Sequence, residues 1–176
     1  MNKLLIITWI SGSWKTTLQD ELLSRWWVRP INFTTRKPRS DEELDEYVFL
    51  NTEQYFSKMK NWDFLESTNY NGNWYWVSSH LQEWDVCIVL DPIGREQALE
   101  KMTRLLPNLK PVCIYLDLSS DKQIDRLRKR WDSDEQIKAR QRDFKWFSPS
   151  KSSHCLDANL ETKKLADDIC EIFKKT

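Results

Sequence analysis

The sequence predicts an α/β fold in which a parallel β-sheet is flanked by helices. Short runs of consecutive apolar, mostly branched residues occur at 4–7, 86–90 (followed by Asp91) and 111–116, which is the pattern of strands buried on both faces of a sheet. Amphipathic segments of helical length alternate with these runs, and strands that alternate with helices build a parallel sheet. A chain of 176 residues can bury such a core in one domain without a disulfide or a metal.

The first half of the chain adds a smaller group of elements to the first strand. We expect a helix over 18–26, a short strand over 28–33 and a polar, proline-interrupted loop over 34–43. A strand over 47–50 precedes a helix over 52–60, where Thr52 is a plausible N-cap and Tyr55, Phe56 and Met59 share one face. Two strands, 64–68 and 73–78, flank a turn at 69–72 and predict a hairpin.

The second half returns to the alternation of buried strands and helices. Helices are expected over 93–106, from Ser119 or Ser120 to 130, from 132 to 144 and over 160–175. A last short strand is expected over 154–156.

The segment after the first strand has the layout of a phosphate-binding loop. A strand, a short polar loop, the pair Lys15-Thr16 and a helix follow the order of the motif G-x-x-x-x-G-K-[ST]. In such a loop backbone N–H groups and the positive end of the helix hold phosphate oxygens, while the lysine adds a point charge and the hydroxyl binds Mg²⁺. The motif predicts a phosphate-binding site made of Ser11, Gly12, Ser13, Trp14, Lys15, Thr16 and Thr17, with Thr16 on Mg²⁺.

Tryptophan occupies both glycine positions of this motif, at Trp9 and Trp14. Glycine serves there because the loop needs backbone angles that are costly for other residues, and because the ligand approaches the backbone closely. An indole inside the loop would compete with phosphate for the same space. The alternative interpretation is an ordinary buried strand and helix beside an unrelated lysine and threonine.

The composition argues against nucleic acid or a membrane as the main partner. Basic and acidic residues are balanced at 27 each, so no net positive charge attracts polyanions. No apolar run approaches the roughly 18 residues of a membrane-spanning helix. The four cysteines are widely spaced, without a C-x-x-C pair, which predicts free thiols that are mostly buried. We therefore expect a soluble cytoplasmic protein.

Tryptophan is over-represented and glycine under-represented. The chain has ten tryptophans and three glycines, whereas glycine averages about 7% of protein sequences. Trp84 and Trp131, for example, fall where a turn or a helix end favours glycine. We hypothesise that tryptophan replaces glycine at turn positions of a parent sequence. A genuine aromatic core is the alternative, and it suits Trp26, Trp74 and Trp146 better.

Several blocks of the sequence, taken together, resemble guanylate kinases over nearly the whole chain. The most specific block is Thr-Thr-Arg-Lys-Pro-Arg at 34–39. The others are the phosphate-loop segment, Tyr-Val-Phe at 47–49, Asp-Phe-Leu-Glu at 63–66, Gly-Asn-Trp-Tyr at 72–75 and Leu-Asp at 90–91.

This resemblance implies Mg²⁺-dependent transfer of the γ-phosphoryl group of ATP to GMP, which gives ADP and GDP. It also implies a P-loop NTPase-type core over 1–33, 79–125 and 146–176, a small mixed α/β lobe that binds GMP over 34–78, and a helical lid over 126–145. The partners are then GMP and ATP, Mg²⁺ is the cofactor, and the protein is a monomer or a homodimer.

The resemblance assigns the GMP site to particular side chains. Arg36, Arg39, Tyr47 and Tyr75 are implied as a clamp on the GMP phosphate, which suits guanidinium groups that neutralise a dianion. Glu66 is implied as the guanine reader. One carboxylate accepts from both donors on the N1/N2 edge of guanine, whereas adenine presents an acceptor at N1.

Further roles are implied at the ATP side and at the strand ends. Lys15, Arg130 and Arg140 are implied as the catalytic cations, with both arginines in the lid. Asp91 is implied at the GMP site, or as a second ligand of the metal. Asn32 is implied at the GMP site although a serine is usual there. The family's glycines at 9, 14, 76, 84 and 131 are all tryptophan in this chain.

Other interpretations compete with these roles. Arg36 and Arg39 could be solvated loop charges, Glu66 an exposed strand residue, and the basic cluster at 126–130 a helix end favoured by the helix dipole. For the whole chain, the alternative function is a non-catalytic guanylate kinase-like module that has lost ATP binding and binds GMP or a phosphopeptide through its arginines. A kinase for another nucleoside monophosphate is a third option, which Glu66 disfavours.

Overall fold

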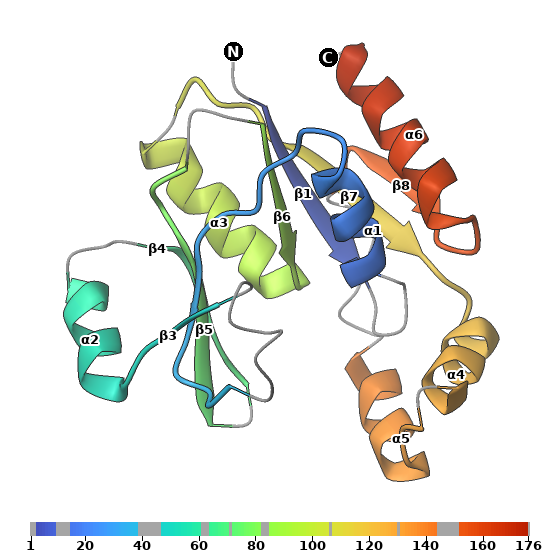
Figure 1. The fold of residues 1–176 in the computed structure, drawn as a ribbon, viewed down its shortest axis with the longest axis horizontal. Helices are drawn as coiled ribbons and strands as arrows, with labels where there is room; N and C mark the ends of the chain where they lie inside the picture. Colours follow the sequence, from blue (N-terminus) through green and yellow to red (C-terminus); the bar gives the residue numbers. More distant parts are fainter. Residues whose placement is uncertain are drawn as a thin grey trace.

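The computed structural model describes residues 3–9, 15–38, 47–60, 64–70, 72–81, 85–105, 107–129, 131–143 and 152–175. These residues form two four-stranded sheets with helices packed on them. Figure 1 shows the parallel sheet on the right and the other sheet on the left. The predicted α/β class, with a parallel sheet flanked by helices, is confirmed.

The first sheet has the strand order β6-β1-β7-β8, and all its neighbouring strands are parallel. Its strands are β1 (Leu4–Trp9), β6 (Val86–Leu90), β7 (Val112–Asp117) and β8 (His154–Asp157). The apolar run in β1 is buried on both faces, as its composition predicts. Because the strands run in one direction, their carboxyl ends gather at one edge, which is where ligands bind in open α/β sheets.

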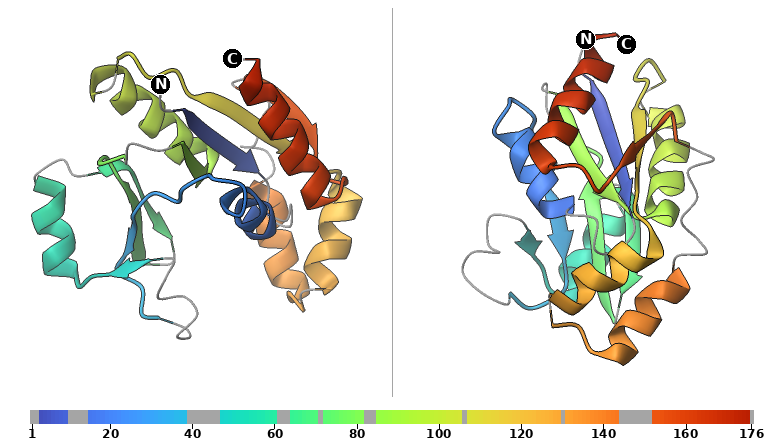
Figure 2. Two further views of the ribbon diagram at one scale, coloured as in Figure 1. Left: turned by 45° about the horizontal axis from the view of Figure 1, so that its top comes forward. Right: turned by 90° about the vertical axis from the view of Figure 1, so that its right-hand side faces the viewer.

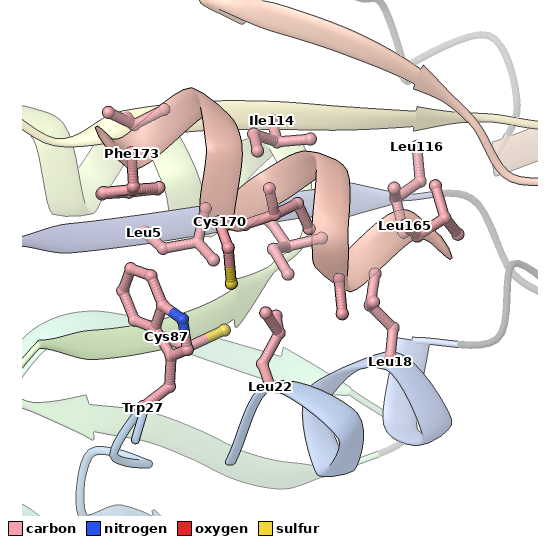
Figure 3. Packing of buried hydrophobic residues seen from close by; sticks show 14 of the residues in the cluster. Leu5, Leu18, Leu22, Trp27, Cys87, Ile114, Leu116, Leu165, Cys170 and Phe173 are labelled. Carbon is pink, nitrogen blue, oxygen red and sulfur yellow. The ribbon is translucent and has the colours of Figure 1, made fainter. Parts of the chain in front are cut away.

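Helices cover both faces of this sheet. On one face, α1 (Lys15–Leu23) and α6 (Thr162–Lys174) pack against Leu5 of β1 (Figure 3). On the other face, α3 (Pro92–Leu105) packs against Leu4 and Ile6. Alternate residues of one strand therefore enter two separate hydrophobic clusters, as the pleat of a β-strand requires.

Trp27 closes one end of the cluster between α1 and α6. Its buried ring meets the ring of Phe173 edge-on, with 4.7 Å between the centroids (Figure 3). The neighbouring Trp26 is 65% exposed and has a φ of +102°. The prediction that Trp26 belongs to an aromatic core is therefore wrong. The chain leaves α1 through a left-handed residue at 26, and this turn places the side chain at 27 in the core instead.

The second sheet has the strand order β3-β2-β5-β4. Its strands are β3 (Val48–Phe49), β2 (Asn32–Thr34), β5 (Asn73–Ser78) and β4 (Phe64–Tyr70). β2 and β3 are parallel, and the other pairs are antiparallel. The predicted hairpin is the β4–β5 pair, with Gly72 at a φ of +78° in its turn.

Helix α2 (Thr52–Lys60) has the predicted bounds and covers one face of this second sheet. The ring of Tyr55 stacks on Trp74 at 4.9 Å and meets Trp76 edge-on at 4.8 Å between centroids. Trp74 thus packs in an aromatic cluster, as predicted. Phe56 and Met59 are exposed, so Tyr55 is the only residue of the predicted apolar face that is buried.

Helices α4 (Ser120–Lys129) and α5 (Asp134–Asp143) follow each other along the chain, and we call them the α4–α5 pair. Figure 2 shows it on the opposite side of the molecule from α2. The turn between its helices passes through Trp131, whose φ is +66°. Trp131 N–H donates to the carbonyl of Arg128 and Asp132 N–H to that of Leu127, which is the hydrogen-bond pattern of a left-handed helix end.

The predicted strand over 28–33 is divided between the two sheets. Val28 makes an isolated parallel bridge to Val86 at the edge of the first sheet, and β2 joins the second sheet. Pro30 lies between them and has no N–H for a sheet ladder. One short segment therefore passes from one sheet to the other. Helix α1 begins at Lys15, three residues earlier than predicted.

The thiol predictions hold for the part of the chain that the structure describes. Cys87, Cys113 and Cys170 are free and buried, and Cys155 is free and exposed. Among the described helices, none combines the length and apolar character that a bilayer crossing needs.

Candidate active site

The structure describes the two elements that flank the predicted phosphate loop, β1 and α1. β1 ends at Trp9 and α1 begins at Lys15, so the strand–loop–helix order of the motif is present. The amino end of α1 therefore follows the central strand, and a helix amino end attracts anions. Thr17 is exposed in the first turn. Ser11, Gly12, Ser13 and Trp14 lie outside the described residues, as do the side chains of Lys15 and Thr16.

Strand register places three predicted GMP-site residues on one face of the second sheet. Val77 of β5 pairs with Asn32 of β2 on one side and with Glu66 of β4 on the other. Directly paired residues share a face, and so do residues two apart on a strand, so Tyr75 lies on the same face. Val77 belongs to the cluster packed against α3. This face is therefore turned toward the first sheet, away from α2.

The Thr-Thr pair of the 34–39 block fastens the start of its loop to β5. Thr34 Oγ1 donates to the carbonyl of Trp74 at 2.9 Å, and Trp74 N–H donates to Thr35 Oγ1 at 2.8 Å. Arg36 N–H donates in turn to Thr34 Oγ1 at 3.1 Å. These bonds fix the backbone from which Arg36 projects.

Arg36 lies among aromatic rings that lead to Tyr75. Its guanidinium carbon is 5.8 Å from the ring centroid of Tyr47 and 5.7 Å from that of Phe49. The Tyr47 ring meets the Tyr75 ring edge-on at 6.1 Å between centroids. The structure thus brings together three of the four predicted clamp residues. Arg39 lies outside the described residues.

Glu66 is a buried carboxyl group, not an exposed strand residue. It is only 5% exposed. Burial raises the pKa of Glu66 to about 7, and the nearby charge of Asp91 adds to this effect. The Thr68 hydroxyl, which donates to Oε2 at 3.4 Å, and the backbone N–H of Val77 act in the opposite direction. At neutral pH, Glu66 is therefore close to the midpoint between its protonated and its ionised form.

Asp91 caps the amino end of α3 beside Glu66. Its Oδ1 accepts the backbone N–H of Gly94 at 2.7 Å. A Cβ atom at Gly94 would lie 3.1 Å from Glu66 Oε2 and 3.5 Å from Asp91 Oδ1. The missing side chain at 94 therefore allows α3 to approach both carboxyl groups. The sequence placed Asp91 at a strand end, and the structure gives it this capping contact.

Two arginines of the α4–α5 pair, Arg140 and Arg126, are held by contacts within the protein. Arg140 Nε lies 2.7 Å from Asp132 Oδ2 in an ion pair. Arg126 donates to the carbonyl of Ala158 at 2.8 Å, which ties α4 to the segment after β8. Arg130 lies outside the described residues.

Three contributors to the site were missed from the sequence. Thr68 could have been found, because it lies two residues after Glu66 and shares its strand face. Gln97, whose Oε1 accepts the N–H of Ser67 at 3.1 Å, and Asp132 gave no signal, since each acts on a residue of another element. In the described part of the chain, no three His, Cys, Asp or Glu side chains cluster as a metal site would require.

Comparisons with known proteins agree with this architecture. The family described as guanylate kinase matches residues 1–175. The guanylate kinase of Fusobacterium nucleatum is 31% identical over 185 residues, covering 99% of this chain and 97% of that protein. The guanylate kinase of Prochlorococcus marinus is 39% identical over 79 residues, covering 43% of this chain and 42% of that protein.

Solved structures share the fold at lower sequence identity. A guanylate kinase from Anaplasma phagocytophilum superposes with a TM-score of 0.71 at 20% identity, covering 99% of this chain and 85% of that one. A gluconokinase from Sinorhizobium meliloti gives a TM-score of 0.54 at 11% identity, covering 94% of this chain and 88% of that one.

We predict that Glu66→Gln stabilises the protein above pH 7. The pKa of Glu66 is about 7 in the folded state against an ordinary value of 4.5, so the folded protein keeps a proton that the unfolded chain releases in this range. The parent therefore loses stability as the pH rises from about 4.5 to about 7, by on the order of 2–3 kcal/mol. Glutamine is neutral throughout and avoids this loss.

Urea unfolding between pH 4.5 and pH 8.5 measures this effect. The difference between Glu66→Gln and the parent should grow up to about pH 7 and vanish near pH 4.5. Glu53→Gln, at an exposed position of α2, serves as the control and should show no such trend. If the free energy of unfolding of Glu66→Gln equalled that of the parent at every pH, burial would not raise the pKa of Glu66 as stated.

Proposed function

This chain belongs to the guanylate kinase family and is a nucleoside monophosphate kinase, and we propose that it transfers the γ-phosphoryl group of MgATP to GMP in the cytoplasm. In this function the chain has a core (1–33, 79–125 and 146–176), a GMP-binding lobe (34–78) and a lid (126–145). The second sheet with α2 lies in the proposed lobe, and the α4–α5 pair lies in the proposed lid.

The observation that carries the proposal is the buried Glu66 on the face that also holds Tyr75 and Asn32. As a carboxylate, Glu66 accepts a hydrogen bond from each of the two donors on the N1/N2 edge of guanine. A buried acceptor is costly when it is left without a donor, so adenine, with an acceptor at N1, is rejected. Because the pKa of Glu66 is about 7, guanine binding below that pH releases the proton of Glu66.

The proposed phosphate clamp lies at the end of the same face. Arg36, Tyr47 and Tyr75 converge there, and we assign Arg39 to the same group. A GMP phosphate carries two negative charges, which two guanidinium groups neutralise through paired hydrogen bonds while phenol hydroxyls complete the shell. The base and the phosphate are then held at separate points, so the attacking phosphate oxygen has a defined position.

We assign the ATP phosphates to the loop between β1 and α1. In this assignment Ser11, Gly12, Ser13, Trp14 and Thr17 supply backbone or hydroxyl donors, Lys15 contributes its charge, and Thr16 binds the Mg²⁺ that accompanies ATP. Magnesium bound mainly by nucleotide phosphates and water needs only one or two protein ligands. Asp91, whose Oδ1 accepts Gly94 N–H, is assigned to the GMP site or to the metal through its second oxygen.

Phosphoryl transfer then needs no protein nucleophile. An oxygen of the GMP phosphate attacks the γ-phosphorus of ATP, the bond to the β,γ-bridging oxygen breaks, and ADP leaves. Lys15, Arg130 and Arg140 neutralise the charge that spreads over the transferred group. Closure of the lid excludes water, which would otherwise accept the phosphoryl group.

One feature of the chain favours a second candidate function. Tryptophan at both glycine positions of the phosphate loop is compatible with a module that binds GMP, or a phosphopeptide, without binding ATP. The retention of Lys15, Thr16, Arg130 and Arg140 favours the kinase, because a phosphopeptide site has no use for them.

We predict that this chain binds GMP more tightly than ATP, because the described GMP-site residues are intact while indoles stand in the phosphate loop. Calorimetric titration with GMP, and separately with ATP and Mg²⁺, measures both affinities. Glu66→Gln should weaken GMP binding and leave ATP binding unchanged. Tight ATP binding without GMP binding would reverse the proposal, and phosphopeptide binding without either nucleotide would favour the second function.

We predict that turnover requires glycine in the phosphate loop. Trp9→Gly combined with Trp14→Gly should raise kcat/KM by at least about 10²-fold, because glycine lets the phosphates approach the loop backbone closely and lie in line with GMP. An assay that couples ADP release to a measurable signal compares this variant with the parent chain. GMP should be preferred over AMP by about 10⁴-fold. Equal rates with both acceptors would refute the guanine-reading role of Glu66.

A further inference from the structure

The turn of the α4–α5 pair holds a carboxylate in a fixed position. Trp131 N–H and Asp132 N–H both bond to carbonyls in the last turns of α4, at 2.9 and 3.1 Å. On the other side of the turn, Ser133 N–H donates to Gln136 Oε1 at 2.8 Å, and Gln136 N–H donates to Ser133 Oγ at 3.3 Å. This reciprocal pair is a capping box that starts α5. Asp132 therefore sits between two backbone anchors.

Asp132 uses this fixed position to hold Arg140. The ion pair joins Arg140 Nε to Asp132 Oδ2 at 2.7 Å and spans eight residues across the turn. The Asp132 side chain is 10% exposed and that of Arg140 is 31% exposed. A pair shielded to this degree is stronger than an ordinary surface ion pair, which solvent and salt weaken.

We propose that Asp132 is a positioning residue for phosphoryl transfer, acting through Arg140. This inference rests on the proposed function, because it takes Arg140 as a catalytic cation. The ion pair uses Nε, the inner nitrogen of the guanidinium group. A phosphoryl group is gripped by the terminal nitrogens, which carry four of the five N–H donors. Binding to Asp132 therefore orients the guanidinium plane.

Asp132→Asn tests this role, since it keeps the size of the side chain and removes its charge. In the variant that carries Trp9→Gly and Trp14→Gly, Asp132→Asn should lower kcat by about tenfold to a hundredfold, because a displaced cation loses its alignment with the reacting group. The KM for GMP should stay unchanged. Asp132→Glu should restore part of the rate. Asp134→Asn, in the exposed first turn of α5, is the matched control and should leave kcat unchanged.

Two further measurements separate positioning from general stability. In an Arg140→Ala background, Asp132→Asn should cause no further loss of kcat, because its effect passes through Arg140. In the unmodified chain, the ¹⁵N–¹H NMR signal of Arg140 Nε–H should shift in Asp132→Asn and not in Asp134→Asn. The proposal would be overturned if the losses of kcat caused by Asp132→Asn and Arg140→Ala were additive, or if the Nε–H signal did not change in Asp132→Asn. The NMR result needs no turnover, so it stands even if the proposed kinase activity fails.

A second inference concerns the backbone at two tryptophans. Among the residues that the structure describes, the only non-glycine residues with positive φ are Trp26 and Trp131. L-residues with a side chain rarely adopt such angles, and glycine adopts them readily. Both residues follow the end of a helix, where glycine is the usual left-handed residue. The two residues are 65% and 93% exposed, so packing does not compensate for the unfavourable backbone conformation.

The composition points to the same positions. Three glycines and ten tryptophans make thirteen residues of 176, which is about the 7% that glycine alone contributes to an average protein. The phosphate loop adds two further cases, since Trp9 and Trp14 occupy places where the motif has glycine.

The geometry points to glycine at positions 26 and 131, and by extension at 9 and 14, in the protein that its source cell makes. The codons written as tryptophan at these places would then be read as glycine by that cell. Trp27, which is buried against Phe173, is a tryptophan that the core uses, so it provides the contrast within the same chain.

Melting temperatures test this inference without any activity. Trp26→Gly and Trp131→Gly should each raise the melting temperature by about 2–4 °C, whereas Trp26→Ala and Trp131→Ala should give less, because alanine keeps the unfavourable φ. Trp27→Gly should lower it. Mass spectrometry of peptides from the source protein should show the lighter, glycine-containing peptides. Glycine variants no more stable than alanine variants, or tryptophan masses in the source peptides, would overturn the inference.

Discussion

The structure depends on one hydrophobic contact, the packing of α3 between the two sheets. Ala98 and Met102 of α3 share a cluster with Leu4 and Ile6 of the first sheet and with Val77 of the second. This cluster fixes the second sheet relative to the parallel sheet. The amino end of α3 then comes to lie beside Glu66, and Gly94 leaves the space for that approach. The position of the proposed guanine reader is thus a consequence of core packing between sheets.

The electrostatics of the site follow from this packing. Burial and the neighbouring Asp91 raise the pKa of Glu66 to about 7, so the folded protein keeps an acidic group where water would ionise it. Without a ligand that donates two hydrogen bonds to it, this buried carboxyl group makes the site less stable than an apolar core would be. Two of the proposed site cations are also held by contacts within the protein: Arg36 lies among aromatic rings at an anchored loop, and Arg140 forms an ion pair with Asp132. In the proposed function, the acceptor and these cations are therefore already arranged before a nucleotide binds, which reduces the reorganisation that binding requires.

The tryptophans show where local and global preferences disagree. Trp27, Trp74 and Trp76 pack on other aromatic rings or in the core. Trp26 and Trp131 instead occupy left-handed helix ends without burying their rings. The sequence pattern identified Trp131 as a turn residue but placed Trp26 in the core, because two adjacent tryptophans after an amphipathic helix do not reveal which of them faces inward. Only the path of the chain after α1 distinguishes them.

By itself, the sequence determined the parallel core, the hairpin, the bounds of α2 and the family, because these depend on local periodicity and on motifs that are contiguous in the chain. The tertiary structure decided which residues meet. It divided residues 28–34 between two sheets, buried Glu66 beside Asp91, and paired Arg140 with Asp132 across a turn. These contacts join side chains from separate elements, and their distances follow from how the sheets and α3 pack, which no local pattern encodes.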